Sequence, residues 1–119
     1  AIMPLYPSQV RPIKGRVILV EGIFDMLNLH DKGLENVMCC FGTRNIDIDK
    51  LKLLKMQGVS QVDILFDPDE AGQDASTKLE EMCDIAEILH KNIKIPVSLG
   101  DAGALTKDKV KQLKEQLYG

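Results

Sequence analysis

Residues 64–69 restrict the possible folds of this chain more than any other stretch, because an apolar run ends abruptly in Asp67-Pro68-Asp69. Such a run is typical of a strand that is buried on both faces of a parallel sheet. Open α/β sheets place their ligands at the carboxyl ends of such strands, and alternate side chains there point to the same side. Two close carboxylates repel unless a cation intervenes, which favours a metal site. Asp-Pro-Asp is also ordinary turn chemistry before a helix, so this stretch alone leaves both interpretations open.

Strand and helix patterns alternate along the rest of the chain. Strands are expected at residues 17–20 and 37–41, in the run that ends at Phe66, and at 93–99. Helices are expected at residues 25–31, 47–57 and 75–89, and after a capping Thr106. Pro96 suits an edge position for the fourth strand. The alternation predicts an α/β fold, a four-stranded and mainly parallel sheet with helices on both faces.

The length of 119 residues fits one domain, which we place at residues 16–119 after an extended lead-in or linker over 1–15. The lead-in contains the basic residues Arg11 and Lys14, with Arg16 just after it, and we expect these three charges to be solvated. The net charge of −3 does not indicate an overall affinity for nucleic acid. No apolar run is long enough to span a membrane.

The three cysteines, Cys39, Cys40 and Cys83, have neither the number nor the spacing of a disulfide framework or a zinc site. They are expected to be small core residues, which favours a reducing and cytoplasmic location. His30 and His90 fall in predicted helices without partner ligands, so no metal role is expected for either.

Four acidic positions follow predicted strands: Glu21, the pair Asp67 and Asp69, and Asp101. Because the carboxyl ends of parallel strands lie at one edge of a sheet, these side chains should converge. Oxygen ligands of this kind suit Mg²⁺ and metal-assisted phosphoryl or nucleotidyl transfer. Asp25 is interpreted as a helix cap at least as readily as a catalytic residue.

The residues around these acidic positions resemble those of a known family. Val20-Glu21-Gly22 after one strand and Asp67-x-Asp69 after another resemble the Toprim domain, which is shared by primases, topoisomerases, RecR repair proteins and some nucleases. The resemblance covers roughly residues 16 to 105. Phe41-Gly42-Thr43 and residues 67–75 look most similar to bacterial-type (DnaG-like) and phage DNA primases.

The resemblance implies roles for individual residues. Asp67 and Asp69 would be ligands of Mg²⁺ (or Mn²⁺), and Glu21 would be a ligand or a general acid/base. Asp101 would be a further ligand, although Ala102 stands where many family members have proline. Gly22, Gly42 and Gly72 would contact substrate. Glu70 and Gln73 replace basic residues that many bacterial primases carry beside this Ala-Gly pair, a departure that would weaken contacts with template or nucleotide.

The resemblance therefore implies the catalytic Toprim domain of a DNA primase, which makes RNA primers for DNA replication. Its implied partners are nucleoside triphosphates, a single-stranded DNA template and, through other parts of the parent protein, the replicative helicase. We expect such a domain to be an excised part that is inactive alone. Two alternatives remain: a small stand-alone Toprim nuclease acting on structured RNA or DNA, and a non-catalytic RecR-like interaction module.

Overall fold

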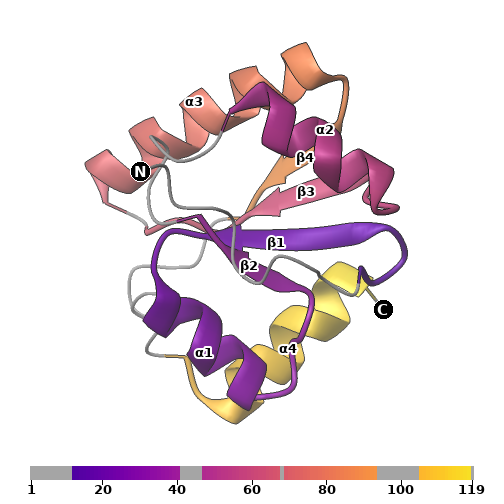
Figure 1. Ribbon diagram of the computed structural model, residues 1–119. Coiled ribbons are helices and arrows are strands. Elements are labelled where there is room, and N and C mark those ends of the chain that lie inside the picture. The colour runs from indigo at the N-terminus through magenta and orange to yellow at the C-terminus, as the bar shows by residue number, and fades with distance from the viewer. Residues whose placement is uncertain (1–11, 41–46, 68, 94–104, 119) are drawn as a thin grey trace.

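The structure is a computed structural model of the chain, and it describes residues 12–40, 47–67, 69–93 and 105–118. Four parallel strands form one sheet in the order β2-β1-β3-β4 (Figure 1). The strands are β1 (Arg16–Val20), β2 (Val37–Cys39), β3 (Gln61–Ile64) and β4 (Leu89–Asn92). The predicted parallel sheet is confirmed, and its fourth strand lies at an edge as expected.

Helices cover both faces of the sheet, again as predicted (Figure 1). They are α1 (Ile23–Asp31), α2 (Ile48–Met56), α3 (Glu70–Ala86) and α4 (Lys107–Tyr118). The helices belong to two hydrophobic core clusters. Helices α2 and α3 pack on one face of the sheet, and α1 and α4 pack on the other. None of the helices in the described part of the chain has the length and apolar character that crossing a membrane requires.

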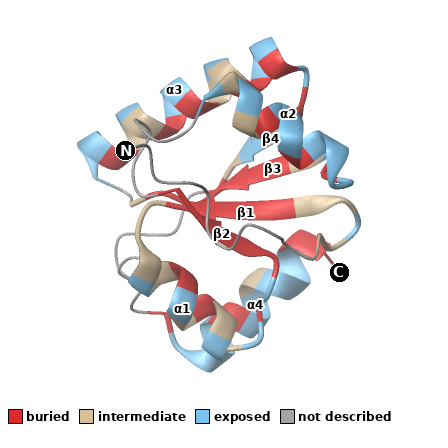
Figure 2. Ribbon diagram, viewed as in Figure 1, coloured by how far each residue is buried: buried red, intermediate tan, exposed pale blue. Residues whose placement is uncertain are grey.

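The central strand β1 shows why the sheet needs cover on both sides. Val17 and Leu19 contribute to the α2/α3 cluster, whereas Ile18 and Val20 contribute to the α1/α4 cluster. All four side chains are fully buried, and Figure 2 shows the same burial along β1 and β3. A strand with two buried faces has no polar alternation, which is why its sequence is a continuous apolar run. The three cysteines are buried and form no disulfide with one another, as expected of small core residues.

The fourth strand was predicted too late in the chain, and the third helix was predicted both to begin and to end too late. Helix α3 ends at Ala86, because Glu87 adopts a left-handed conformation with φ of 58° and the Ile88 amide turns back to the Cys83 carbonyl at 3.0 Å. Strand β4 then begins at Leu89, whereas this strand had been predicted at residues 93–99. His90 therefore lies in a strand and not in a helix. Residues 94–99, including Pro96, lie outside the described part of the chain.

Helix starts follow the capping signals in most cases. Asp47 caps α2 by accepting a hydrogen bond from the Lys50 amide at 2.9 Å. Thr106 precedes α4 and accepts from the Lys109 amide at 3.4 Å. Helix α1 differs from the prediction, because its N-cap is Gly22 and Asp25 lies inside its first turn. A carboxylate there still stabilises the helix through its dipole.

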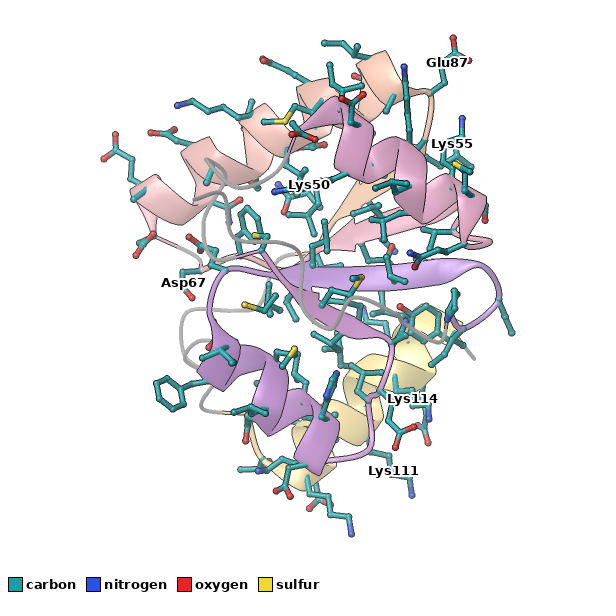
Figure 3. All side chains as sticks on the ribbon, in the orientation of Figure 1. Lys50, Lys55, Asp67, Glu87, Lys111 and Lys114 are labelled. Carbon is teal, nitrogen blue, oxygen red and sulfur yellow. The ribbon has the colours of Figure 1, made fainter. Side chains whose placement is uncertain are left out.

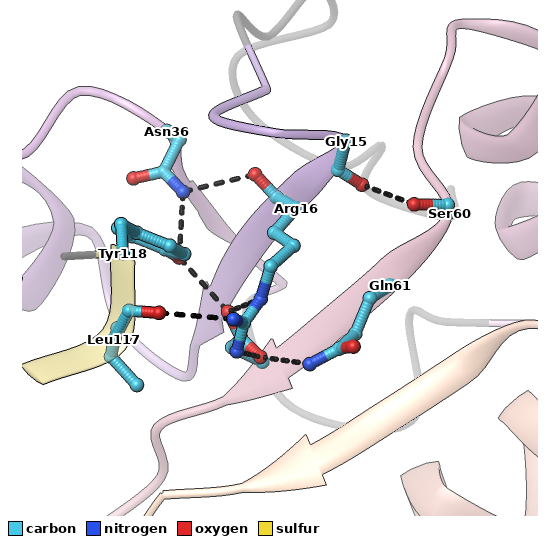
Figure 4. A network of polar contacts seen from close by, with 8 residues as sticks. Gly15, Arg16, Asn36, Ser60, Gln61, Leu117 and Tyr118 are labelled. Atoms are coloured by element: carbon cyan, nitrogen blue, oxygen red, sulfur yellow. Dashed lines mark hydrogen bonds and ion pairs between the residues drawn. The ribbon is translucent and has the colours of Figure 1, made fainter.

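The expectation of a solvated charge was wrong for Arg16, whereas Lys14 is exposed as expected. Arg16 forms two hydrogen bonds to the buried carboxylate of Asp63, from Nε at 3.1 Å and from Nη2 at 2.8 Å (Figure 4). The Tyr118 hydroxyl donates to the same carboxylate at 2.9 Å, and Lys14 Nζ donates to the Tyr118 carbonyl at 2.7 Å. These contacts attach the end of α4 to β1 and β3. Arg11 lies outside the described residues.

Candidate functional site

The carboxyl ends of β1 and β3 lie side by side and bring Glu21 to Asp67. Leu19 pairs with Ile64, and the Leu65 amide continues the ladder by donating to the Leu19 carbonyl at 2.9 Å. One step further, the Asp67 amide donates to Glu21 Oε1 at 3.0 Å. Figure 3 shows Asp67 at this end of the sheet. Two acidic positions that are 46 residues apart in the sequence are therefore in direct contact.

Asp69 has the helix-capping role that turn chemistry allows. It is the N-cap of α3, and its Oδ1 accepts a hydrogen bond from the Gly72 amide at 2.7 Å. The bond ties one carboxylate oxygen to the first turn of the helix and leaves the other oxygen outside that contact. Capping and metal binding are therefore compatible at this residue.

Gly72 allows the start of α3 to lie directly against Asp67. A Cβ atom placed on Gly72 would lie 2.2 Å from the Asp67 carbonyl oxygen, a distance that no real side chain tolerates. The glycine is buried, and its backbone conformation is not left-handed. The close approach to Asp67 is therefore the structural reason for a glycine at this position. The structure thus provides a packing reason for Gly72, independent of any contact with substrate.

Gln73 is a site residue whose contact the sequence analysis missed. Its Nε2 donates to the Asp67 carbonyl at 3.1 Å, which links the first turn of α3 to the end of β3. The sequence drew attention to this position only because a basic residue stands there in many bacterial primases. A glutamine in the first turn of a helix has no distinctive pattern, so its local signal is weak.

The electrostatics of the site favour a proton or a cation. Burial raises the pKa of Glu21 above its ordinary value, and the nearby carboxylates of Asp67 and Asp69 raise it further. The hydrogen bond from the Asp67 amide acts in the opposite direction and lowers the pKa of Glu21, but the pKa remains raised. A bound cation would relieve this repulsion among like charges.

The donor set fits a hard divalent metal ion in kind, since all three side chains offer carboxylate oxygens. The hydrogen bonds to Glu21 and Asp69 each use one oxygen of the carboxylate and leave the second one outside the contact. Within residues 12–40, 47–67, 69–93 and 105–118, however, no three His, Cys, Asp or Glu side chains are arranged so that they could hold an ion as they stand. Asp101 and Gly42 were also predicted for this site, and both lie outside the described residues.

The two histidines make other contacts. His30 Nε2 lies 2.9 Å from the Val37 carbonyl. His90 lies between two carboxylates of α3, with Nδ1 at 3.2 Å from Glu80 and Nε2 at 2.8 Å from Asp84. Gly22, the N-cap of α1, follows Glu21 directly and adds no side chain to this part of the site.

Comparisons with known proteins agree with this geometry. A family model described as Toprim-like matches residues 18–106. A DNA primase of Chlamydia muridarum is 40% identical over 73 residues, which are 61% of this chain and 12% of that protein. A DNA primase of Clostridium acetobutylicum is 40% identical over 80 residues, or 67% of this chain and 13% of that protein. The chain spans only 12–14% of the length of the curated relatives it matches.

Solved structures share the fold. A primase of Aquifex aeolicus, comprising zinc-binding and RNA polymerase domains, superposes with a TM-score of 0.73 at 30% identity, covering 88% of this chain and 25% of that one. A small TOPRIM domain protein from Bacillus stearothermophilus superposes with a TM-score of 0.60 at 24% identity. That match covers 86% of this chain and 84% of the other, and at this identity it shows the fold alone.

Proposed function

This chain belongs to the Toprim-like family, and on that premise we propose that it is the catalytic domain of a DNA primase. Relatives that are 40% identical and are named DNA primase support this choice within the family. The observation that carries the proposal is the hydrogen bond from the Asp67 amide to Glu21, because it joins the two acidic strand ends that nucleotidyl transfer requires. Residues 16–119 are the domain in this proposal, and residues 1–15 lead into it.

In this proposal Glu21, Asp67 and Asp69 would hold Mg²⁺ or Mn²⁺, and Asp101 would be a further ligand. Once bound, the metal stabilises the negative charge on attacking and leaving oxygens in phosphoryl chemistry. The hydrogen bonds already described would orient two of the carboxylates, since Glu21 is held by the Asp67 amide and Asp69 by the Gly72 amide. Orientation of this kind reduces the cost of collecting like charges around an ion.

Glu21 is the best candidate for moving a proton in this site. Its raised pKa means that it keeps a proton at a higher pH than an ordinary glutamate does, which suits a general acid/base. Gly22, Gly42 and Gly72 are proposed to allow close approach of substrate, because glycine adds no side chain. For Gly72 this role would come in addition to its packing against Asp67.

The substrates in this proposal are nucleoside triphosphates and a single-stranded DNA template, and the product is an RNA primer for DNA replication. The replicative helicase would bind other parts of a longer protein, and the location would be the cytoplasm. We expect the 119-residue chain to bind metal but to make little primer by itself, because it spans so small a share of its primase relatives.

Metal binding is tested by thermal unfolding with increasing Mg²⁺ or Mn²⁺. A ligand that binds only the folded state at about 100 times its dissociation constant stabilises it by about 2.7 kcal/mol. We expect this stabilisation in the natural sequence and its loss in Asp67→Asn/Asp69→Asn. Asparagine is an effective N-cap, so the variant removes two charges and keeps the start of α3.

The matched control is Asp47→Asn/Asp49→Asn, which makes the same two changes at the N-cap and first turn of α2. It should respond to metal as the natural sequence does. If the natural sequence and the site variant respond identically, the metal site is refuted and a non-catalytic interaction module becomes the better description.

The reaction is tested in the full-length parent protein. Asp67→Asn should abolish primer synthesis on single-stranded DNA while leaving the fold intact. The nuclease alternative uses the same carboxylates to activate water, so cleavage of structured RNA or DNA is assayed in parallel. Cleavage without primer synthesis would overturn the primase proposal and leave the metal site standing.

A further inference from the structure

Phe24 is an aromatic side chain that the fold leaves in solvent. Its exposed fraction is 81%, whereas Phe66 and Tyr118 are buried with exposed fractions of 3% and 6%. Among the described residues it is the single exposed Phe or Tyr. A lone exposed apolar residue needs no explanation in general, so its position in the molecule decides whether it means anything.

The position of Phe24 is next to the acidic site. It is the second residue of α1, and only Gly22 and Ile23 separate it from Glu21. Ile23 packs against the α1/α4 cluster, and Gly22 has no side chain to cover a neighbour. Helix α1 begins at the end of the sheet where β1 and β3 end (Figure 1). The ring therefore belongs to the same edge of the sheet as the carboxylates.

A second apolar side chain extends this surface. Leu27 lies one helical turn after Phe24 and is 48% exposed, so the two residues share one side of α1. Together they form a small apolar surface on a rigid helix beside a site for polyphosphate chemistry. An aromatic ring in this position has a flat face about as large as a nucleobase.

We propose that Phe24 is a stacking platform for a nucleobase that enters the site, an inference that rests on the proposed function. Stacking on aromatic side chains is a common way to hold single-stranded nucleic acid, and it tolerates any sequence because every base has a π-face. The ligand is the base of an incoming nucleotide, because only Gly22 and Ile23 separate Phe24 from Glu21, one of the residues that would engage its phosphates. Phe24 would position the base while Glu21, Asp67 and Asp69 engage the reacting groups.

A protein segment fits this surface less well. Recognition of an amphipathic helix needs a groove that takes several apolar anchors. The described residues do form a hollow, but it lies on the α2/α3 side of the sheet, and its lining combines the exposed apolar residues Met56 and Ile85 with charged residues of α2 and Glu87. The apolar surface on α1 consists of one ring, that of Phe24, and one leucine. In the sequence the acidic residues Glu21 and Asp25 lie on either side of Phe24. A single flat contact of this size suits a base.

The absence of tryptophan from the sequence makes a direct test possible. Phe24→Trp introduces a single indole whose fluorescence falls when a base stacks on it. The variant is titrated with an oligo(dT) strand and, separately, with ATP in the presence of Mg²⁺. Met56→Trp is the matched control, because Met56 is 82% exposed and lies on α2. We expect quenching in the first variant and little or none in the second.

A second pair of variants measures affinity without a tryptophan. Phe24→Leu should weaken binding of the quenching ligand at least about fivefold, because stacking of one base is worth on the order of 1 kcal/mol or more. Phe24→Tyr keeps the ring and should bind like the natural sequence. Because the side chain is exposed, both variants should fold.

The outcomes separate this inference from the proposed function. Quenching by ATP supports the inference, whereas quenching by oligo(dT) alone would assign the ring to the template strand and overturn it. No quenching by either ligand, or equal quenching in Met56→Trp, overturns the inference. The stability response to metal is measured on the same samples. A metal response without quenching leaves the proposed function standing, whereas a missing metal response refutes the metal site whatever the tryptophan reports.

Discussion

The two ends of the β1–β3 pair both hold carboxylates, but in opposite electrostatic settings. Asp63 is buried, whereas Glu21 and Asp67 are half-buried and Asp69 is exposed. At the amino end the fully buried Asp63 accepts hydrogen bonds from Arg16, Tyr118 and Gln61 (Figure 4). At the carboxyl end Glu21 lies beside Asp67 and Asp69, and its pKa is raised by burial and by their negative charge. Asp63 is neutralised within the protein, whereas Glu21 lies close to like charges.

The comparison distinguishes a carboxylate with a structural role from carboxylates for which a function is proposed. A buried carboxylate that is paired and hydrogen-bonded attaches elements to one another, and here it joins β1, β3 and the end of α4. Carboxylates collected without a counter-charge cost stability, so a protein keeps them where a ligand supplies the missing charge. The same residue type therefore stabilises the fold at one end of the sheet and, in the proposed function, would hold a ligand at the other.

The largest effect is expected at the paired end. Asp63→Ala leaves the Arg16 guanidinium without its counter-ion, and breaking a buried pair costs about 3–5 kcal/mol. Urea denaturation should show a loss of this size in the free energy of unfolding. The double variant Arg16→Met/Asp63→Leu removes both charges and should recover much of the loss. A cost below about 1 kcal/mol, the usual value of an exposed pair, would contradict the structural role of Asp63.

A smaller effect is expected from the packing that supports the site. Gly72→Ala places a methyl group against the Asp67 carbonyl oxygen, so α3 or the end of β3 has to shift. Overpacking of this kind costs about 1–3 kcal/mol, and urea denaturation measures it. The metal response should weaken in the same variant, because Asp67 and Asp69 lose their relative placement.

Ala71→Gly is the control for Gly72→Ala, because it changes an exposed residue of the same helical turn. It should cost no more than about 1 kcal/mol of helix propensity and leave the metal response unchanged. An unchanged stability in Gly72→Ala would mean that the close approach to Asp67 is not required.

The smallest effect is a change in pH dependence at the carboxyl end of the β1–β3 pair. The pKa of Glu21 is raised in the folded state above its ordinary value of 4.5. The stability associated with this proton is fully present below pH 4.5 and is lost as the pH rises through the folded-state pKa. Glu21→Gln removes this loss, since glutamine does not titrate and its oxygen can still accept from the Asp67 amide. Relative to the natural sequence, the variant should gain stability between acidic and neutral pH.

Unfolding free energies measured across this pH range check the prediction. Glu81→Gln, on the exposed side of α3, controls for the loss of one negative charge. Parallel pH profiles for Glu21→Gln and the natural sequence would show that Glu21 is not held against the other carboxylates.

Much of this architecture could be predicted from local patterns. The apolar run of β1 predicted a strand, the run that ends at Phe66 predicted a strand covered on both faces, and the Asp47 signal predicted the start of α2. The acidic residues after β1 and β3 were found because strand ends in a parallel sheet share one edge. The roles assigned to them stay proposals until metal binding is measured.

Other features could not be predicted from local patterns. Asp63 stands in the same run as the candidate ligands and was passed over, because its partners Arg16 and Tyr118 are 47 and 55 residues away. The start of β4 was misplaced, since Leu89 is an apolar residue at helical spacing that is nevertheless 68% exposed. Its pairing with Gln61 exists only in the assembled sheet.

The sequence by itself determined the alternation of strands and helices and the acidic residues at two strand ends, because both depend on neighbours along the chain. The tertiary structure decided that Asp63 is neutralised and that Glu21 lies close to like charges, and it decided that Phe24, in the first turn of α1 and two residues beyond Gly22, stays exposed. Those outcomes depend on which distant residues meet. At the amino end of the sheet Arg16 meets Asp63, and at the carboxyl end acidic side chains meet one another.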